Sequence, residues 1–343
     1  MRKTRSKIGT LRAGLILTLL AGALFFATGC GGAENDLTKL DDTALGIDKT
    51  VADQQKDYRQ IAVFAGEPEK YGDLIMVISV NRKTDEAKIV SVYNSTYMQM
   101  TDGKPYKIRG QEQDFYRCGA EWSLGGMTGA VKMLNRHMDL SIRECVAIEW
   151  FGIEDLVNQI NGIEVNVTKE MAEVMNKTMI PGDQIKKPGK MTLNGAQTVE
   201  YLKCRTDKGA TAKDRAARNQ EILKKIFAGL GAMGVSELDI LSGDIGDEMV
   251  LSVNDKTIDD LLKKIGRMKG GQTPAWPYKG KMMKENFKGK KGKTVTVSYL
   301  VPDTLGSNVT ALHKILFGES KYKPSKTVTD LDKKITEKAK TLK

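Results

Sequence analysis

The stretch "DLIMVISVNRKTDEAKIVSVYNSTYM", residues 73–98, decides the fold. It opens with an almost continuous apolar run, Leu74–Val80, passes through a polar turn, Asn81–Glu86, and continues as a second strand pattern over Lys88–Tyr93. An earlier run, Ile61–Phe64, has the same apolar character. Short continuous apolar runs are typical of strands buried on both faces of a sheet. The later two segments therefore predict a hairpin inside a layered domain.

Helical and strand patterns alternate after this hairpin. Apolar residues recur at helical spacing over 125–140, which predicts an amphipathic helix. Strand patterns over 145–150 and 163–167 enclose a helical segment, 152–162, and a further amphipathic helix is expected over 211–231. This order predicts an α/β fold (α+β layered), with a central mixed β-sheet flanked by helices.

The composition limits the classes of function. The 343 residues carry a formal net charge of +11, which favours an anionic partner such as nucleic acid, an anionic membrane surface or a phosphorylated substrate. With 2 histidines in the whole chain, a His-based metal site or a His-centred triad is difficult to build. We expect both, His137 and His313, to be structural because they lie in amphipathic helical segments.

The N-terminus has the pattern of an export signal. Basic residues precede an apolar run, Ala13–Thr28, that ends at Gly29 and Cys30. Small residues before Cys30 resemble a bacterial lipobox, although Ala27 stands where Leu is usual, so Cys30 is the predicted lipidation site. The alternative is an uncleaved signal-anchor, but about sixteen apolar residues are short for a span of ~20. Either reading places the body outside a cytoplasmic membrane and argues against DNA or cytosolic RNA as a partner.

Composition also divides the chain. The predicted parts are a signal peptide with lipobox (1–30), a polar linker (31–55), a core (56–231), an extension of the same domain (232–322) and a charged tail expected to fray (323–343).

Three cysteines follow the signal: Cys118, Cys145 and Cys204. We expect them to be buried and unpaired, acting as small apolar residues. A disulfide between Cys118 and Cys145 is the alternative that an oxidising compartment permits.

Four cations lie close together in the sequence: Lys203, Arg205, Arg215 and Arg218. The last two share one face of the predicted helix near its N-terminus, which points toward the loop that follows Arg205. Helix N-termini and arginine forks both bind phosphate oxygens, so the group predicts an oxyanion or pyrophosphate receptor. The alternative is a solvated basic face.

Four segments stand in the order and approximate spacing of the LytR-CpsA-Psr (LCP) family of cell-envelope proteins: "DLIMVISVNRKTDEAKIVSVYNSTYM", "INGIEVNV", "LNGAQTVEYLKCRTD" and "RAARNQEIL". The resemblance is clear over residues 60–230. Members of that family move a glycopolymer from a polyprenyl pyrophosphate carrier to peptidoglycan through a phosphodiester, need a divalent metal and house the prenyl tail in an apolar tunnel. The resemblance therefore implies an LCP-like fold with such a tunnel, Mg²⁺ or Mn²⁺ as cofactor, and a membrane-anchored, extracytoplasmic transferase.

The resemblance also implies roles for single residues. Asp73 stands at the family's metal-binding aspartate, and Glu67 at a second acidic position just upstream. The pyrophosphate would be held by residues of three segments, and Arg205 and Arg215 would act in catalysis together with Asp73. The pyrophosphate residues are Lys203, Arg205, Arg215, Arg218, Asn219, Asn94 and Ser95.

The main departure from the family lies after the second strand. The family usually reads Arg-Asp-Thr where this chain reads Asn94-Ser95-Thr96. Replacing a charged bidentate donor with a neutral amide typically costs ~2–4 kcal/mol of transition-state stabilisation. Two hypotheses follow: a transferase with an attenuated site, or an LCP-fold protein that binds polyprenyl phosphate lipids as a carrier or regulator of envelope assembly. A third, a basic lipoprotein that adheres to anionic wall polymer, explains the charge but not the ordered motifs. The polymer, teichoic acid or capsule, stays open.

Overall fold

The computed structural model describes residues 36–68, 70–206, 212–233, 249–253, 273–288 and 293–343. Within the range Leu37–Lys343 the described residues form one compact unit, which contains the fold. The predicted signal, with Cys30, lies outside the described residues. Among the helices of the described ranges, none combines the length and the apolar character that a membrane crossing requires.

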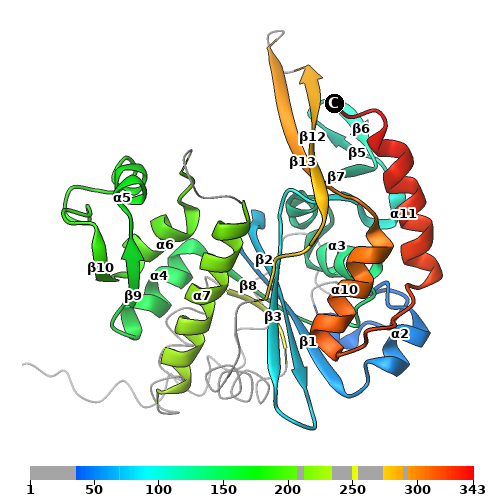
Figure 1. Cartoon of the computed structure of the whole chain (residues 1–343), viewed down its shortest axis with the longest axis horizontal. Helices are drawn as coiled ribbons and strands as arrows, with labels where there is room; N and C mark the ends of the chain where they lie inside the picture. Colours follow the sequence, from blue (N-terminus) through cyan, green and yellow to red (C-terminus); the bar gives the residue numbers. More distant parts are fainter. Residues whose placement is uncertain (1–35, 69, 207–211, 234–248, 254–272, 289–292) are drawn as a thin grey trace, which may run out of the picture. The chain divides into compact units, whose positions relative to one another are not determined.

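A five-stranded mixed sheet forms the centre of the unit (Figure 1). Strand β1 pairs antiparallel with β2 and parallel with β8, and β11 and β3 form the two edges. The strands, in sheet order, are β11 (Met249–Ser252), β8 (Glu144–Glu149), β1 (Tyr58–Glu67), β2 (Lys70–Asn81) and β3 (Ala87–Val92). The predicted mixed sheet and the β2–β3 hairpin are confirmed.

Helices cover both faces of this sheet (Figure 1). The helices are α2 (Lys49–Gln54), α3 (Glu121–Met138), α4 (Trp150–Gln159), α5 (Lys169–Met175), α6 (Gly195–Lys203), α7 (Ala212–Gly231), α10 (Leu305–Phe317) and α11 (Lys326–Ala339). Four two-stranded sheets complete the described fold: β4 (Tyr97–Gln99) with β7 (Phe115–Arg117), β5 (Tyr106–Ile108) with β6 (Gln111–Gln113), β9 (Ile163–Val167) with β10 (Gly189–Leu193), and β12 (Gly280–Lys288) with β13 (Thr294–Pro302).

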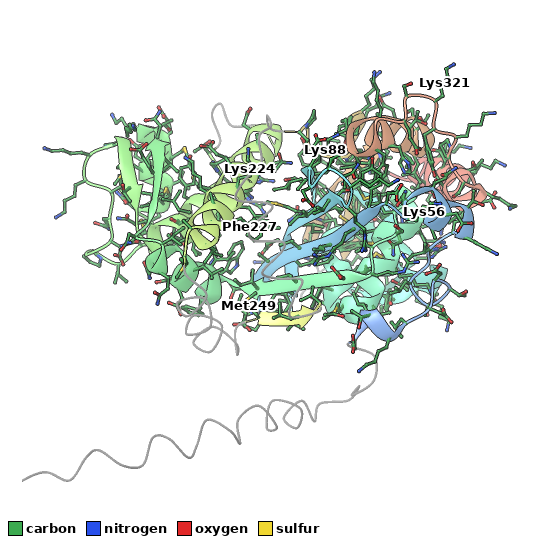
Figure 2. The ribbon with its side chains drawn as sticks, turned by 90° about the horizontal axis from the view of Figure 1, so that it is seen from below. Lys56, Lys88, Lys224, Phe227, Met249 and Lys321 are labelled. Carbon is green, nitrogen blue, oxygen red and sulfur yellow. The ribbon has the colours of Figure 1, made fainter. Side chains whose placement is uncertain are left out.

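The sheet separates two apolar cores because successive side chains of a strand point to opposite faces. On β1, Ala62 and Phe64 belong to the core shared with α3, α10 and α11. Ile61 and Val63 belong to the core shared with α4, α5, α6 and α7. Figure 2 labels Phe227 on α7 and Met249 on β11, two partly buried side chains that pack against this second core. The near-continuous apolar runs are thus explained by burial on both faces.

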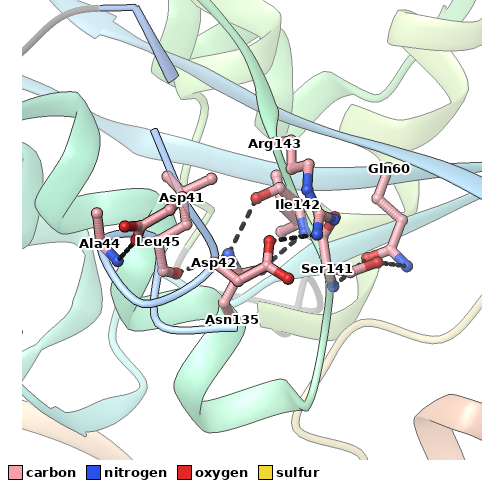
Figure 3. Close-up of polar contacts among 9 residues, drawn as sticks. All are labelled: Asp41, Asp42, Ala44, Leu45, Gln60, Asn135, Ser141, Ile142 and Arg143. Carbon is pink, nitrogen blue, oxygen red and sulfur yellow. Dashed lines mark hydrogen bonds and ion pairs between the residues drawn. The ribbon is translucent and has the colours of Figure 1, made fainter. Parts of the chain in front are cut away.

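The prediction that residues 31–55 form a linker is wrong for most of that segment. Leu37, Leu45 and Val51 are buried in the first core. Figure 3 shows how polar contacts hold the segment: Asn135 on α3 donates a hydrogen bond to the Leu45 carbonyl oxygen over 2.9 Å, and Arg143 pairs with Asp42. The few apolar residues of this polar segment suffice because they are buried in the first core, so the folded unit begins at Leu37.

The predicted frayed tail, 323–343, is also wrong. It forms α11, whose apolar residues recur every three or four positions and are buried in the first core: Val328, Leu331, Ile335 and Ala339. The many lysines of this segment lie on the opposite face. Of the predicted extension 232–322, the described part contributes β12, β13 and α10 to the same core.

The cysteine prediction is confirmed: Cys118, Cys145 and Cys204 are buried and unpaired. Both histidines are also fully buried.

Candidate functional site

The turn that joins β3 to β4, Tyr93–Thr96, is fixed by backbone hydrogen bonds. Each of its residues bonds to a residue distant in sequence, over 2.9 to 3.0 Å: Tyr93 with Trp276, Asn94 with Gly119, Ser95 with Leu300 and Thr96 with Cys118. Because the backbone is held at every position, the side chains of this turn have a defined place from which to act.

Two glycines bring the start of β2 against this turn. A Cβ atom on Gly72 would lie 1.7 Å from the carbonyl oxygen of Gly119, in the 3-10 helix η3 (Cys118–Ala120). Only glycine permits that approach. It places Asp73 beside Asn94, whose Nδ2 donates a hydrogen bond to the Asp73 carbonyl oxygen over 3.1 Å.

A pocket that is open to solvent lies between the starts of β2 and α7 and the end of β3. Its polar lining includes Asp73, Asn94, Arg215 and Asn219, which are four of the residues predicted from the sequence. The structure thus brings together residues from three separate segments. Ser95, Lys203, Arg205 and Arg218 are not among the lining residues.

Positive charge gathers around this pocket. Burial lowers the pKa of Arg215, and the nearby charges of Arg205, Arg218 and Arg117 lower it further. The guanidinium group makes no hydrogen bond or ion pair within the described residues. Like charges held together in a partly dry site favour the binding of an anion, which relieves their repulsion.

Arg117, at the end of β7, is the site residue that sequence reasoning missed. Its Nη2 donates a long hydrogen bond, 3.4 Å, to Oδ1 of Asn94. Nothing in the local sequence singled out this arginine, because it comes to lie beside Asn94 through the pairing of β7 with β4, in which Arg117 is opposite Tyr97. A cation therefore lies next to the position where the family's arginine is replaced by Asn94.

Two further predicted cations are engaged with protein groups. Lys203 lies 3.6 Å from the carboxylate of Glu67 and over the ring of Trp150. Arg218 donates from Nη2 to the Cys204 carbonyl oxygen over 2.8 Å, so it ties α7 to the end of α6. The exposed Arg205 follows α6.

The residues present fit a metal bound through one carboxylate. Asp73 is exposed at the pocket, and its carboxylate makes no hydrogen bond or ion pair within the described residues. Among all the residues that the structure describes, no group of three or more His, Cys, Asp or Glu side chains could hold a metal ion. Mg²⁺ is commonly bound by one or two carboxylates together with substrate phosphates and water. Asn219 adds an orphaned acceptor, since its buried Oδ1 has no hydrogen-bond partner in the described structure.

The model of the LytR_cpsA_psr family matches residues 44–261. Among curated relatives, the polyisoprenyl-teichoic acid-peptidoglycan teichoic acid transferase TagT of Bacillus subtilis (strain 168) is 26% identical over 155 residues, which cover 45% of this chain and 44% of the relative. The corresponding transferase TagU of Enterococcus faecalis is 25% identical over 193 residues, 56% of this chain and 57% of the relative. The chain thus spans about half the length of these relatives.

Solved structures share the fold. TagT bound to LIIa-WTA superposes with a TM-score of 0.58 at 18% identity, covering 78% of this chain and 93% of that one. The crystal structure of B. subtilis TagV gives a TM-score of 0.57 at 19% identity, covering 78% and 99%. At this level of identity the likeness concerns the arrangement of helices and strands.

Proposed function

The chain belongs to the LytR-CpsA-Psr family, and we propose that it is an extracytoplasmic phosphotransferase that joins a glycopolymer, carried on polyprenyl pyrophosphate, to peptidoglycan. The single observation that carries the proposal is the pocket in which Asp73, Asn94, Arg215 and Asn219 meet. Its cationic surroundings suit a pyrophosphate, and the relatives named as teichoic acid transferases supply the class of polymer.

The roles follow from position and charge. Arg215 and Arg117 would hold the pyrophosphate oxygens, with Arg205 at the exposed side, and stabilise the negative charge that develops as the bond to polyprenyl phosphate breaks. Asn219 would orient the same group. Asp73 would hold Mg²⁺ or Mn²⁺, which when bound neutralises charge on the substrate oxygens. The second predicted metal ligand, Glu67, would first have to leave Lys203.

A transfer assay tests the proposal. The full-length protein in detergent is incubated with Mg²⁺, peptidoglycan fragments and a glycan linked to polyprenyl pyrophosphate. We expect a phosphodiester-linked glycan–peptidoglycan product and release of polyprenyl phosphate, both lost in Asp73→Asn. A protein that neither binds nor turns over this donor contradicts the proposal.

One observation favours a second function, that of a carrier or regulator that binds the lipid without transfer. Asn94 and Ser95 stand where the family usually has Arg and Asp, and only Asn94 lines the pocket. The double variant Asn94→Arg/Ser95→Asp separates the two functions, since the fixed turn backbone can carry the new side chains. A large gain from a near-zero baseline favours the binding protein, whereas strong transfer by the parent excludes it.

The proposed location is the outer face of the bacterial cell membrane, with the chain anchored through lipid on Cys30 or through its N-terminal apolar segment. An anchored enzyme stays beside a lipid-linked donor, which raises the local concentration of that donor.

A further inference from the structure

The β12–β13 hairpin carries an exposed basic face that the pocket does not use. Directly opposed residues of its two nine-residue strands share a face. The inner face includes the buried Phe287, Val297 and Tyr299, and it packs against Tyr116. The outer face presents mainly exposed lysine, hydroxyl and amide groups: Lys284 opposite Ser298, Asn286 opposite Thr296, and Lys288 opposite Thr294.

The charged side chains of this hairpin are almost all basic. Five lysines along it are exposed, and none makes an ion pair within the described residues: Lys279, Lys281, Lys284, Lys288 and Lys293. The one acidic residue in the two strands, Glu285, is turned inward and accepts a hydrogen bond from the Tyr299 hydroxyl over 2.9 Å. Of these lysines, Lys284 and Lys288 lie on the outer face, and none of the side chains that the two strands present there is a carboxylate.

The base of the hairpin adjoins the pocket. The backbone N–H of Leu300 on β13 donates to the Ser95 carbonyl oxygen over 2.9 Å, and the neighbouring residue Asn94 lines the pocket. Each strand extends by about 30 Å at ~3.3 Å per residue, and Figure 1 shows the hairpin leaving the body beside the C-terminus. The β12 backbone pairs there with Lys343.

We propose that the outer face of the β12–β13 hairpin is a docking surface for the anionic glycopolymer, which it holds as an extended phosphodiester chain leading away from the pocket. The choice of this polymer as occupant rests on the proposed function. The lysines complement repeating phosphates, and the Ser, Thr and Asn side chains suit a hydroxylated backbone. A membrane surface fits less well, because the exposed Met282 lies at the base of the hairpin and not near its far end.

The test measures binding of a lipid-free poly(glycerol phosphate) chain, so that it does not depend on transfer. The hairpin variant removes the two lysines of the outer face: Lys284→Gln/Lys288→Gln. A matched control removes the same charge from two exposed lysines outside the hairpin: Lys186→Gln/Lys187→Gln. We expect the hairpin variant to bind about tenfold or more weakly, with a smaller dependence on salt, and the control to bind within about twofold of the parent.

Equal losses in the two variants, or none in either, would overturn the inference. So would a hairpin variant that keeps polymer binding but loses binding to vesicles of phosphatidylglycerol and phosphatidylcholine. Thermal unfolding of both variants verifies that the fold is intact. If the parent binds the free polymer through the hairpin but fails the transfer assay, the proposed function fails while the docking surface stands.

Discussion

Arg215 is the residue on which the charge of the pocket depends most directly. It lines the pocket, and its guanidinium is partly buried among three other arginines without a hydrogen-bonded partner in the described structure. Holding that charge costs free energy, because burial and like charges both lower the pKa of Arg215. Binding of the proposed pyrophosphate would offset this cost.

We predict that Arg215→Gln lowers kcat/KM for transfer by about 100-fold or more, without lowering the melting temperature. The reason for the second part is that the change removes a repulsive charge. The control Lys224→Gln removes the same charge from the same helix, about 14 Å further along its axis, and should keep the parent's activity. Similar losses of activity in both variants would contradict a specific role for Arg215.

His137 links the stability of the fold to pH. Its Nδ1 donates to the Met133 carbonyl oxygen over 2.8 Å, and its Nε2 accepts the backbone N–H of Gln99 over 3.0 Å, so the ring is held neutral. Burial lowers the pKa of His137 to about 3. Protonation would turn Nε2 into a donor that faces another donor.

The sign of the effect follows from the pKa difference. The unfolded chain binds a proton at His137 near pH 6.5 and the folded chain does not, so stability is present above that pH and is lost as the pH falls through it. We predict a loss of about 2 kcal/mol from this residue between pH 7.5 and pH 5, measured by urea unfolding. In His137→Gln the loss over the same interval should be smaller by that amount. If the free energies of unfolding of the two proteins differ by the same amount at pH 7.5 and at pH 5, the buried neutral ring is refuted.

At the scale of elements, helix α11 shows how a charged segment becomes part of a core. Its N-cap, Ser325, donates from Oγ to Asp139 at the end of α3 over 2.6 Å, and Asp332 within it accepts the backbone N–H of Leu305 at the start of α10. Its apolar stripe then packs between these two helices. The helix was not predicted from the sequence, because the many lysines of the segment indicated a charged tail. The helical spacing of Val328, Leu331 and Ile335 is the signal that could have identified it.

We predict that Leu331→Ala lowers the free energy of unfolding by about 2–4 kcal/mol, because Leu331 is 2% exposed. Lys334→Ala, an exposed residue of the same helix, should change it by less than about 0.5 kcal/mol. Urea unfolding measures both. Equal effects would mean that α11 frays as the charge of the segment had suggested.

At the scale of the whole molecule, the predictable features are those with a local signature. Strands β1, β2 and β3 were predicted because burial on both faces makes each one apolar along its length, and α7 because its apolar residues follow a helical period. The pocket depends on distant contacts. Asp73 and Arg215 were placed in one site only through the family resemblance, and Arg117 was missed because its place beside Asn94 depends on the pairing of β7 with β4.

The segment between the predicted lipidation site, Cys30, and the folded unit is shorter than the predicted linker 31–55. If lipid is attached at Cys30, the folded unit begins at Leu37, and the intervening chain can span at most about 25 Å at ~3.5 Å per residue. The body would then be confined close to the membrane surface, where a lipid-linked donor lies. An anchored chain of this reach favours repeated encounters with the same bilayer.

We therefore predict that Cys30→Ser moves the protein from the membrane fraction of the producing bacterium to the soluble extracytoplasmic fraction, because a lipobox cysteine is the only attachment point that this change removes. Incorporation of labelled fatty acid should disappear with it. Cys204→Ser, at a buried thiol that is not part of the signal, is the matched control and should retain both the label and the location. A Cys30→Ser protein that stays in the membrane fraction would show instead that Ala13–Thr28 remains as an uncleaved anchor, in which case the length of that apolar run, and not the lipobox, governs how the body is held.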